Sequence, residues 1–159
     1  MHEANVIYAE NVESWLNLQF GASDANPLRY GKTLYIAGEK PTEIVIPQGI
    51  TTIRDSAFVS CKALRSVIIP DSVTSIGSSV FYDCSALESV TIPDSVKSIG
   101  SGAFGLCTNL KNITIPASVE TIGTEAFRGC TNLTVSCYKN SAAHTYCKNN
   151  GVKFQLITN

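Results

Sequence analysis

The sequence predicts a stacked-repeat solenoid: a right-handed coil with a parallel β-sheet on one face and short strands, turns or 3₁₀/helical segments on the other. The first observation is a strict period of 23 residues, kept by the columns Pro47, Pro70, Pro93 and Pro116; Phe58, Phe81, Phe104 and Phe127; Cys61, Cys84, Cys107 and Cys130; and Leu64, Leu87, Leu110 and Leu133. The second is an aliphatic alternation before each proline, and the third is an aliphatic pair after it. A fixed period of this length is typical of stacked repeats, so residues 1–159 are expected to form one repeat domain.

One repeat is too short to enclose its own apolar side chains. Burying each of them is worth roughly 1.5–3 kcal/mol, whereas ordering the backbone costs about 1–2 kcal/mol per residue. A single unit therefore cannot fold alone, and neighbouring units must share one continuous core.

The elements within each unit follow from its residue types. The alternations at 67–69, 90–92 and 113–115 predict strands, each ended by a proline that lacks a ladder donor. The V-x-x-I pair should return along the opposite wall, with a tight bend at Gly77, Gly100 and Gly123. The A-F-x-x-C-x-x-L stretch steps by three residues, as a short helical or 3₁₀ turn would.

Residues 1–40 are expected to form an irregular N-terminal repeat or cap. Val6 and Tyr8 are the expected inward residues of a first strand, and a short helix follows, with an apolar stripe of Val12, Trp15, Leu16 and Phe20. Two further strands should place their aliphatic residues inward: Leu34, Ile36, Ile44 and Ile46. Trp15 could be a ligand platform, but a core or capping role is favoured. Because the chain begins almost inside a strand, it is expected to be cut from a longer protein.

Four 23-residue repeats are expected over residues 41–137, and a C-terminal cap over residues 138–159. The last coil is one residue short, which leaves Leu133, Val135 and Cys137 inward. The segment SAAHTYCKNNG should then form a helix with Ala143, Tyr146 and Cys147 on one face and Gly151 as its stop, before a closing strand in VKFQLI.

The six cysteines are interpreted as core residues, because four of them belong to a repeat column and cysteine is a small, often buried hydrophobe. A disulfide between adjacent coils remains the alternative. A zinc site from Cys130, Cys137, His144 and Cys147 is disfavoured, because structural sites usually pair their ligands through tighter spacings. A Cys147–His144 nucleophile pair lacks an orienting third group.

Composition and motifs exclude several function classes. The net charge of -1 offers no general attraction to nucleic acid, and no apolar run is long enough for membrane insertion by this segment. No phosphate-binding loop, H-E-x-x-H or G-x-S-x-G motif is present. The sequence therefore predicts a protein that is not an enzyme, with no catalytic, cofactor-binding or metal-binding residues.

The outward residues of the parallel strands form the face to which every coil contributes. It is rich in serine, threonine and asparagine, with two aliphatic residues in its first half, which suits an extended protein segment or a glycan. The alternative is that such residues are simply good exposed strand formers. The candidate ligand face consists of Glu43, Val45, Ser66, Ile68, Ser89, Thr91, Asn112, Thr114, Thr134 and Ser136.

The repeats IPDSVTSIGSSVFYDCSALESVTIP and IPDSVKSIGSGAFGLCTNLKNITIP resemble the BspA-like (Treponema pallidum type) leucine-rich repeats of bacterial and protozoan surface proteins. The resemblance is close over residues 41–137, although Gly49 replaces the serine of the first unit and Arg54 its bend glycine. It implies a leucine-rich-repeat solenoid that is extracellular or at the cell surface and acts as a protein-binding or adhesion module. The alternative is a structural spacer within a larger surface protein. Exposed coils at either end or edge would also permit self-association.

Overall fold

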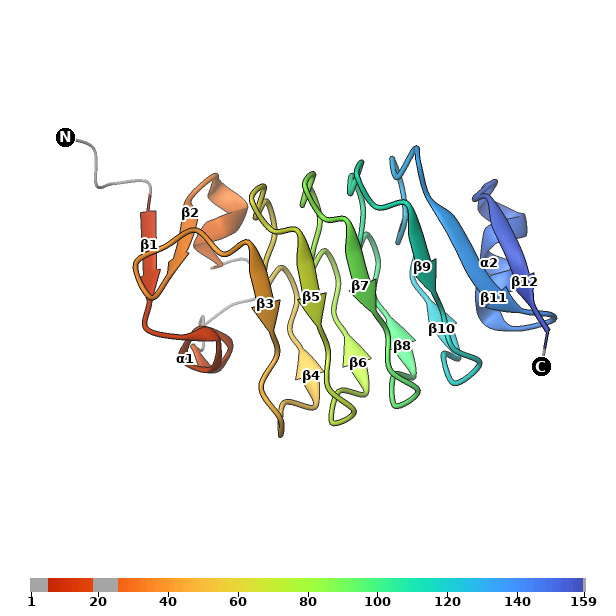
Figure 1. Ribbon diagram of the computed structural model, residues 1–159, viewed down its shortest axis with the longest axis horizontal. Coiled ribbons are helices and arrows are strands. Elements are labelled where there is room, and N and C mark those ends of the chain that lie inside the picture. Colours follow the sequence, from red (N-terminus) through yellow and green to blue (C-terminus); the bar gives the residue numbers. More distant parts are fainter. Residues whose placement is uncertain (1–5, 19–25, 159) are drawn as a thin grey trace.

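A computed structural model of the chain describes residues 6–18 and 26–158, and it is a row of coils stacked side by side (Figure 1). Each coil contributes one strand to the front of the stack, and neighbouring strands are parallel. These strands form two adjoining sheets, ordered β3-β5-β7 and β9-β11-β12. The strands are β3 (Glu43–Val45), β5 (Ser66–Ile68), β7 (Ser89–Thr91), β9 (Asn112–Thr114), β11 (Thr134–Tyr138) and β12 (Phe154–Ile157).

A second row of shorter strands lies on a neighbouring side of each coil. They pair in parallel in the order β10-β8-β6-β4, and in each pair residues 23 positions apart lie opposite one another. The predicted solenoid with a parallel sheet is therefore confirmed, and the V-x-x-I pair forms a strand as expected, but on a neighbouring side of the coil rather than along the opposite wall. These strands are β4 (Thr52–Ile53), β6 (Ser75–Ile76), β8 (Ser98–Ile99) and β10 (Thr121–Ile122).

The four phenylalanines form a continuous stack through the interior. Neighbouring ring centroids are 5.7, 5.4 and 5.6 Å apart along Phe58, Phe81, Phe104 and Phe127, and all four side chains are buried. The leucine column is buried in the same core. Like side chains therefore pack on like, and each coil encloses the apolar face of its neighbour.

The side of the coil that carries phenylalanine differs from the prediction of a helical or 3₁₀ turn. Alternate amides donate within the coil, as from Val59 to the Ser56 carbonyl, while those between them donate to the next coil, as from Phe58 to the Val80 carbonyl. Positive φ angles at Ser56 and Ser60 break any helix. This side of each coil is therefore a series of turns, and backbone hydrogen bonds join it to the equivalent side of the next coil. A three-residue apolar step in the sequence fits such turns as well as it fits a helix.

The bend glycines are required by close packing between coils. Gly77, Gly100 and Gly123 do not have positive φ angles. A Cβ atom on Gly100 would lie 2.4 Å from the Gly77 carbonyl carbon and 2.5 Å from the Ser78 nitrogen. Any side chain at this position would therefore push adjacent backbones apart.

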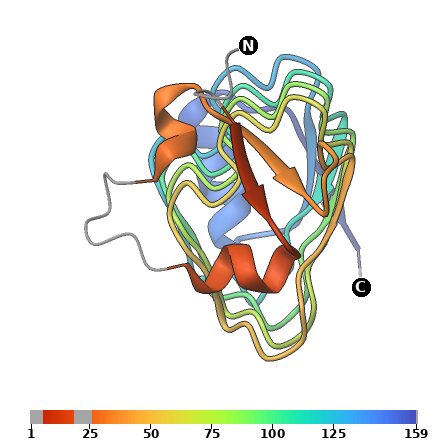
Figure 2. The same ribbon diagram turned by 90° about the vertical axis from the view of Figure 1, so that its left-hand side faces the viewer.

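The N-terminal unit covers the first coil. It contains β1 (Val6–Ala9), helix α1 (Val12–Asn17), the 3₁₀ helix η3 (Pro27–Tyr30) and β2 (Thr33–Ile36), with β1 and β2 paired in parallel. Figure 2 shows β1 and β2 lying across this end of the stack. The predicted burial of Trp15, Leu16 and Leu34 is confirmed, whereas Phe20 lies outside the described residues.

The predicted orientation of the first strand is wrong. Tyr8 is 66% exposed, and Ile7 and Ala9 pack against the core instead. The cause is the register with β2, which places Ile7 beside Leu34 and puts Tyr8 opposite Tyr35, with their rings 5.4 Å apart. The side chain of Val6 lies outside those described.

Aromatic side chains close the turn ladder at both ends of the stack. At the N-terminal end, the Trp15 indole N–H donates to the Ala57 carbonyl at 2.7 Å, where a preceding coil would supply an amide. At the other end, the Phe127 amide donates to the Tyr146 hydroxyl at 3.4 Å, where a following coil would supply a carbonyl. Trp15 is therefore a capping residue, as the sequence favoured.

Arg54 explains why the first coil has no glycine at the bend. The first coil lacks a preceding repeat at this position, so a side chain fits. The Arg54 guanidinium donates to the Trp15 carbonyl and lies 5.6 Å from the centre of the Trp15 ring. This substitution therefore ties the first coil to α1.

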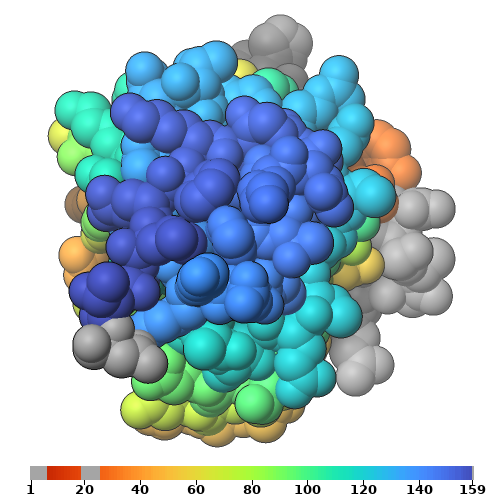
Figure 3. Space-filling model, turned by 90° about the vertical axis from the view of Figure 1, so that its right-hand side faces the viewer, coloured from red at the N-terminus to blue at the C-terminus, as the bar shows by residue number. Residues whose placement is uncertain are grey.

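The C-terminal cap follows the prediction closely. Helix α2 (Ala142–Asn150) begins after the N-cap Ser141 and ends at Gly151, whose φ is 65°. Its buried residues are Ala143, Tyr146 and Cys147, and those of the last coil include Leu133, Val135 and Cys137. Figure 3 shows the C-terminal segments covering much of this end of the molecule.

Candidate ligand-binding surface

The outward residues of β3, β5, β7 and β9 form a low wall along the front of the solenoid. The pairing register places Glu43, Ser66 and Ser89 in one row, and Val45, Ile68 and Thr91 in the next. Of the ten candidate residues, seven are exposed: Glu43, Val45, Ile68, Ser89, Thr91, Asn112 and Thr114. These seven exposed residues make up the front wall.

The apolar part of the front wall lies near its N-terminal end. Val45 and Ile68 are direct register partners and are 50% and 52% exposed. Beside them, the Ser66 hydroxyl donates to the Glu43 carboxylate at 3.1 Å. An apolar side chain of a partner can pack on this aliphatic pair, while the partner's backbone forms hydrogen bonds with the neighbouring carboxylate and hydroxyl groups.

The last coil departs from the predicted exposed face. Ser136 is only 9% exposed, because β12 adds a further strand and Gln155 donates to its hydroxyl at 2.8 Å. Thr134 and Ser66 are half-buried. The available front wall is therefore shorter than expected and ends before β11.

The cysteine column is held as free thiols, and the predicted core role is observed. Cys84 and Cys107 are buried, and their thiols donate to the carbonyls of Phe58 and Phe81 in the preceding coil. Burial raises the pKa of Cys61 to about 12 and raises that of Cys84 well above its usual value. Thiolate formation is therefore suppressed, which makes these groups poor nucleophiles.

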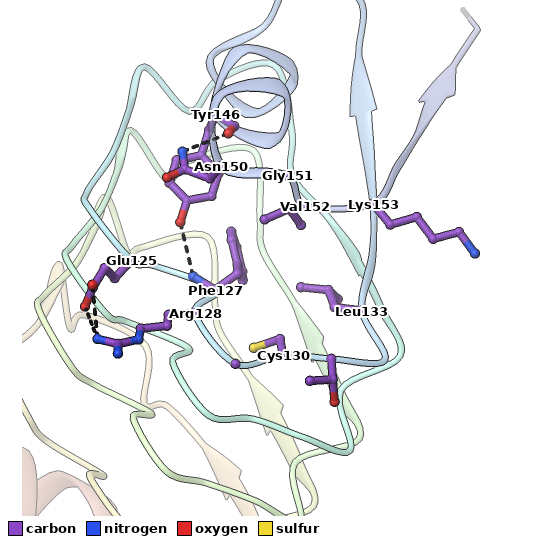
Figure 4. Close-up of a pocket in the computed structure, with 12 residues that line it drawn as sticks. Glu125, Phe127, Arg128, Cys130, Leu133, Tyr146, Asn150, Gly151, Val152 and Lys153 are labelled. Carbon is purple, nitrogen blue, oxygen red and sulfur yellow. Dashed lines mark hydrogen bonds and ion pairs between the residues drawn. The ribbon is translucent and has the colours of Figure 1, made fainter.

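Cys130 differs from the other five cysteines. It is half-buried and lines a pocket of about 620 Å³ beneath α2, where the last coil has no following repeat (Figure 4). A hydrogen bond with Cys107 lowers the pKa of Cys130. The pocket also contains the exposed ion pair between Arg128 and Glu125, at 3.1 Å.

His144 and Cys147, weighed as part of a zinc or nucleophile site, both have other contacts in the structure. The His144 Nδ1 accepts a hydrogen bond from the Asn140 amide at 3.1 Å, and its ring packs edge-on against Phe154. Cys147 points into the core, and burial raises its pKa to about 11. Within residues 6–18 and 26–158, no group of three or more His, Cys, Asp or Glu side chains is placed to hold a metal ion.

The 3₁₀ helix η3 and the buried side chain of Asn26 were not anticipated from the sequence. The side chain of Asn26 is buried, donates to the Ser56 carbonyl at 2.7 Å and accepts from the Leu28 amide. It thus both caps η3 and joins that helix to the first coil. The Asn26-Pro27 dipeptide is a turn-initiation signal that could have located η3, but nothing in it indicates the contact with Ser56.

Comparison with known proteins places this architecture. A model of the BspA type leucine-rich repeat region matches residues 33–149 with six copies. A leucine-rich repeat protein from Bacteroides ovatus is 41% identical over 65% of this chain and 28% of its own, with a TM-score of 0.56. The leucine-rich repeat protein of T. pallidum is 28% identical over 62% of this chain and 60% of its own, with a TM-score of 0.53.

A leucine-rich cell surface protein from Faecalibacterium prausnitzii is also similar, with 34% identity over 68% of this chain and a TM-score of 0.50. The match covers 35% of that protein, so the chain spans between about a quarter and three-fifths of the solved structures described. A search of curated proteins found no match. Neither α1 nor α2, nor any other described helix, is long and apolar enough to cross a bilayer.

Proposed function

This chain belongs to the BspA-type leucine-rich repeat family, and from that premise we propose that it is a protein-binding or adhesion module that engages its ligand with the front wall. Proteins built from such repeats are generally binding or structural proteins and typically non-catalytic. The observation that carries the proposal is the exposed aliphatic pair Val45 and Ile68, near the N-terminal end of a hydroxyl-rich strand face.

The chemistry of the front wall favours an extended protein segment over a glycan. Val45 and Ile68 lie side by side and reach into solvent, so a partner gains by covering them with an apolar side chain. The surrounding serine, threonine and asparagine side chains offer both donors and acceptors to a peptide backbone. A cell-surface location for such a module is supported by the similarity to the F. prausnitzii cell surface protein.

The test is binding of the purified chain to an array of immobilised extracellular matrix proteins. Any partner found is measured again with the double variant Val45→Lys/Ile68→Lys, which places two charges on the aliphatic pair. The matched control is Thr52→Lys/Thr121→Lys, which adds the same charge to exposed positions of the other sheet. We expect the first variant to lose binding and the control to retain it. Equal effects of the two variants, or no matrix partner at all, contradict the proposal.

A structural spacer is the second candidate. It is favoured by the recurrence of small polar residues at the outward positions of β7 and β9, which are Ser89, Thr91, Asn112 and Thr114. A spacer should tolerate the Val45→Lys/Ile68→Lys change in a cell-attachment assay, whereas a binding module should not.

A further inference from the structure

A second recess lies between the N-terminal unit and the first coil, and neither residue of the apolar pair of the front wall lines it. It arises because β2 pairs only with β1 and no ladder joins it to β3. After β2 the chain reverses through Ala37 and Gly38, both with positive φ, before β3 begins. A pocket of about 650 Å³ remains where a regular coil would have packed flush.

The floor of this pocket is apolar. It is made by Leu28 from η3, Leu34 from β2 and Val59 from the first coil, which are 1%, 2% and 8% exposed. Pockets of about 300–1,000 Å³ with apolar walls and a few polar groups are the usual shape of small-ligand sites. The pocket beneath α2 has a similar volume but is more open and more polar.

The rim of the pocket is positively charged. Lys32, Lys40 and Lys62 line it together with one carboxylate, that of Asp83. Asp83 is already engaged, since the Lys62 ammonium lies 3.2 Å from its carboxylate and the Ser60 hydroxyl donates to it at 3.3 Å. The ammonium groups of Lys32 and Lys40 form no ion pair with any described residue.

This concentration of charge contrasts with the whole chain, whose net charge is -1. Lys32 is half-buried and directly precedes β2. The Lys40 Nζ lies 5.9 Å from the centre of the Tyr35 ring. An anionic group entering the rim would therefore meet two available cations.

We propose that this pocket binds a carboxylate carried at the end of a short apolar segment, with the apolar part on Leu28, Leu34 and Val59 and the carboxylate between Lys32 and Lys40. A neutral sugar would leave the apolar floor covered by hydroxyls that find no partners there. A polyphosphate would gain little from the floor. The free carboxylate of a fatty acid and that of an apolar peptide C-terminus share the required chemistry.

The test is isothermal titration of the whole chain with decanoate and with an N-acetylated Val-Leu-Leu peptide bearing a free C-terminal carboxylate. Decanol and the amidated peptide are the uncharged controls. Saturable binding of decanoate alone assigns the site to fatty acids, and binding of the peptide identifies a C-terminus as the ligand. Absence of saturation by both carboxylates up to about 1 mM, or equal binding of the uncharged controls, overturns the proposal.

Variants with opposite expected effects locate the site. Lys32→Gln/Lys40→Gln should weaken binding about five- to tenfold, while the matched pair Lys111→Gln/Lys148→Gln, far from the pocket, should leave it unchanged. Asp83→Asn should tighten binding about two- to fivefold, because it releases the Lys62 ammonium. Asparagine suits this position, where φ is 61°. Equal weakening by both lysine pairs, or weakening by Asp83→Asn, contradicts the assignment.

Discussion

Replacing Phe81 by alanine removes the ring that lies between two others in the phenylalanine stack. Phe81 is 0% exposed, and its ring centroid is 5.7 Å from that of Phe58 and 5.4 Å from that of Phe104. Truncation of a buried phenylalanine costs about 3–5 kcal/mol. Loss of two ring pairs, each worth about 0.5–1.5 kcal/mol beyond area burial, places the expected value near the top of that range.

The assay is urea unfolding followed by circular dichroism. With a slope of about 2 kcal/mol/M, the expected loss of about 4–5 kcal/mol moves the midpoint down by about 2 M. Ile68→Ala is the control, since Ile68 is half exposed and its truncation should cost far less. The slope itself should fall in Phe81→Ala if the lesion separates the coils on its two sides into independent units.

A double-mutant cycle separates ring contact from simple burial. Phe81→Leu and Phe104→Leu should be non-additive, with a coupling of about 0.5–1.5 kcal/mol. Phe58→Leu and Phe104→Leu do not share a direct contact and should be closer to additive. A Phe81→Ala cost no larger than that of Ile68→Ala, or strict additivity of the adjacent pair, would refute the reasoning.

Three other perturbations have expected outcomes. Gly100→Ala should cost about 1–3 kcal/mol or more by urea unfolding, because its Cβ would lie 2.4–2.6 Å from backbone atoms of the preceding coil. Gly105→Ala should cost less, because its Cβ would meet the Tyr82 side chain at 2.6 Å and backbone only at 3.4 Å, at the Gly102 carbonyl oxygen. Equal costs of the two changes would contradict this account. Trp15→Phe should lower the free energy of unfolding by about 1–3 kcal/mol, because it leaves the Ala57 carbonyl without its donor. Tyr146→Phe should lower it less, by about 0.5–1.5 kcal/mol, because the hydrogen bond of its hydroxyl is long. An unchanged free energy of unfolding in Trp15→Phe would exclude the capping role. In native protein at pH 8, a thiol reagent should modify Cys130 before Cys61, because the pKa of Cys130 is lowered and its side chain is only half-buried; simultaneous labelling of the two would count against this. The free energy of unfolding should fall above about pH 8.5, because the unfolded chain then loses thiol protons, whereas folded Cys61 keeps its proton up to about pH 12. A flat free energy of unfolding from pH 8 to 10 would contradict this expectation.

The repeating part of the fold could be predicted because its period is carried by many columns at once. Phe58, Phe81 and Phe104 are equivalent in sequence and are equivalent in the structure. The same repetition concealed the nature of the turns: a step of three residues fits both a 3₁₀ helix and a series of turns. Only the positive φ angles at positions such as Ser56 and Ser60 distinguish the turns from a helix, and a serine in the sequence does not indicate a positive φ.

The ends were harder because their contacts are not periodic. The run Val6–Ala9 is apolar throughout, so alternation could not say which residues point inward. The pairing of Ile7 with Leu34 decides it. Likewise, the bond between Gln155 and Ser136 joins a cap strand to the last coil, and no spacing rule indicates that the cap would shorten the front wall.

The candidate front wall could be located from the sequence, because its residues alternate along each strand with apolar residues that point into the core. The pocket between the N-terminal unit and the first coil could not be located from the sequence, because it results from a missing ladder. Its lysines are scattered in sequence and come together only when η3, β2 and the first coil pack around Leu28.

Amide hydrogen exchange at single-residue resolution tests the stacking of coils in register most directly. The amides of Phe58, Phe81 and Phe104 each donate to the next coil and should be protected together, repeating every 23 residues. Gly129, at the open edge of the last coil, should exchange much faster than its counterpart Leu106, which donates to Arg128. A protection pattern without that period, or equal protection of Gly129 and Leu106, would contradict the in-register solenoid.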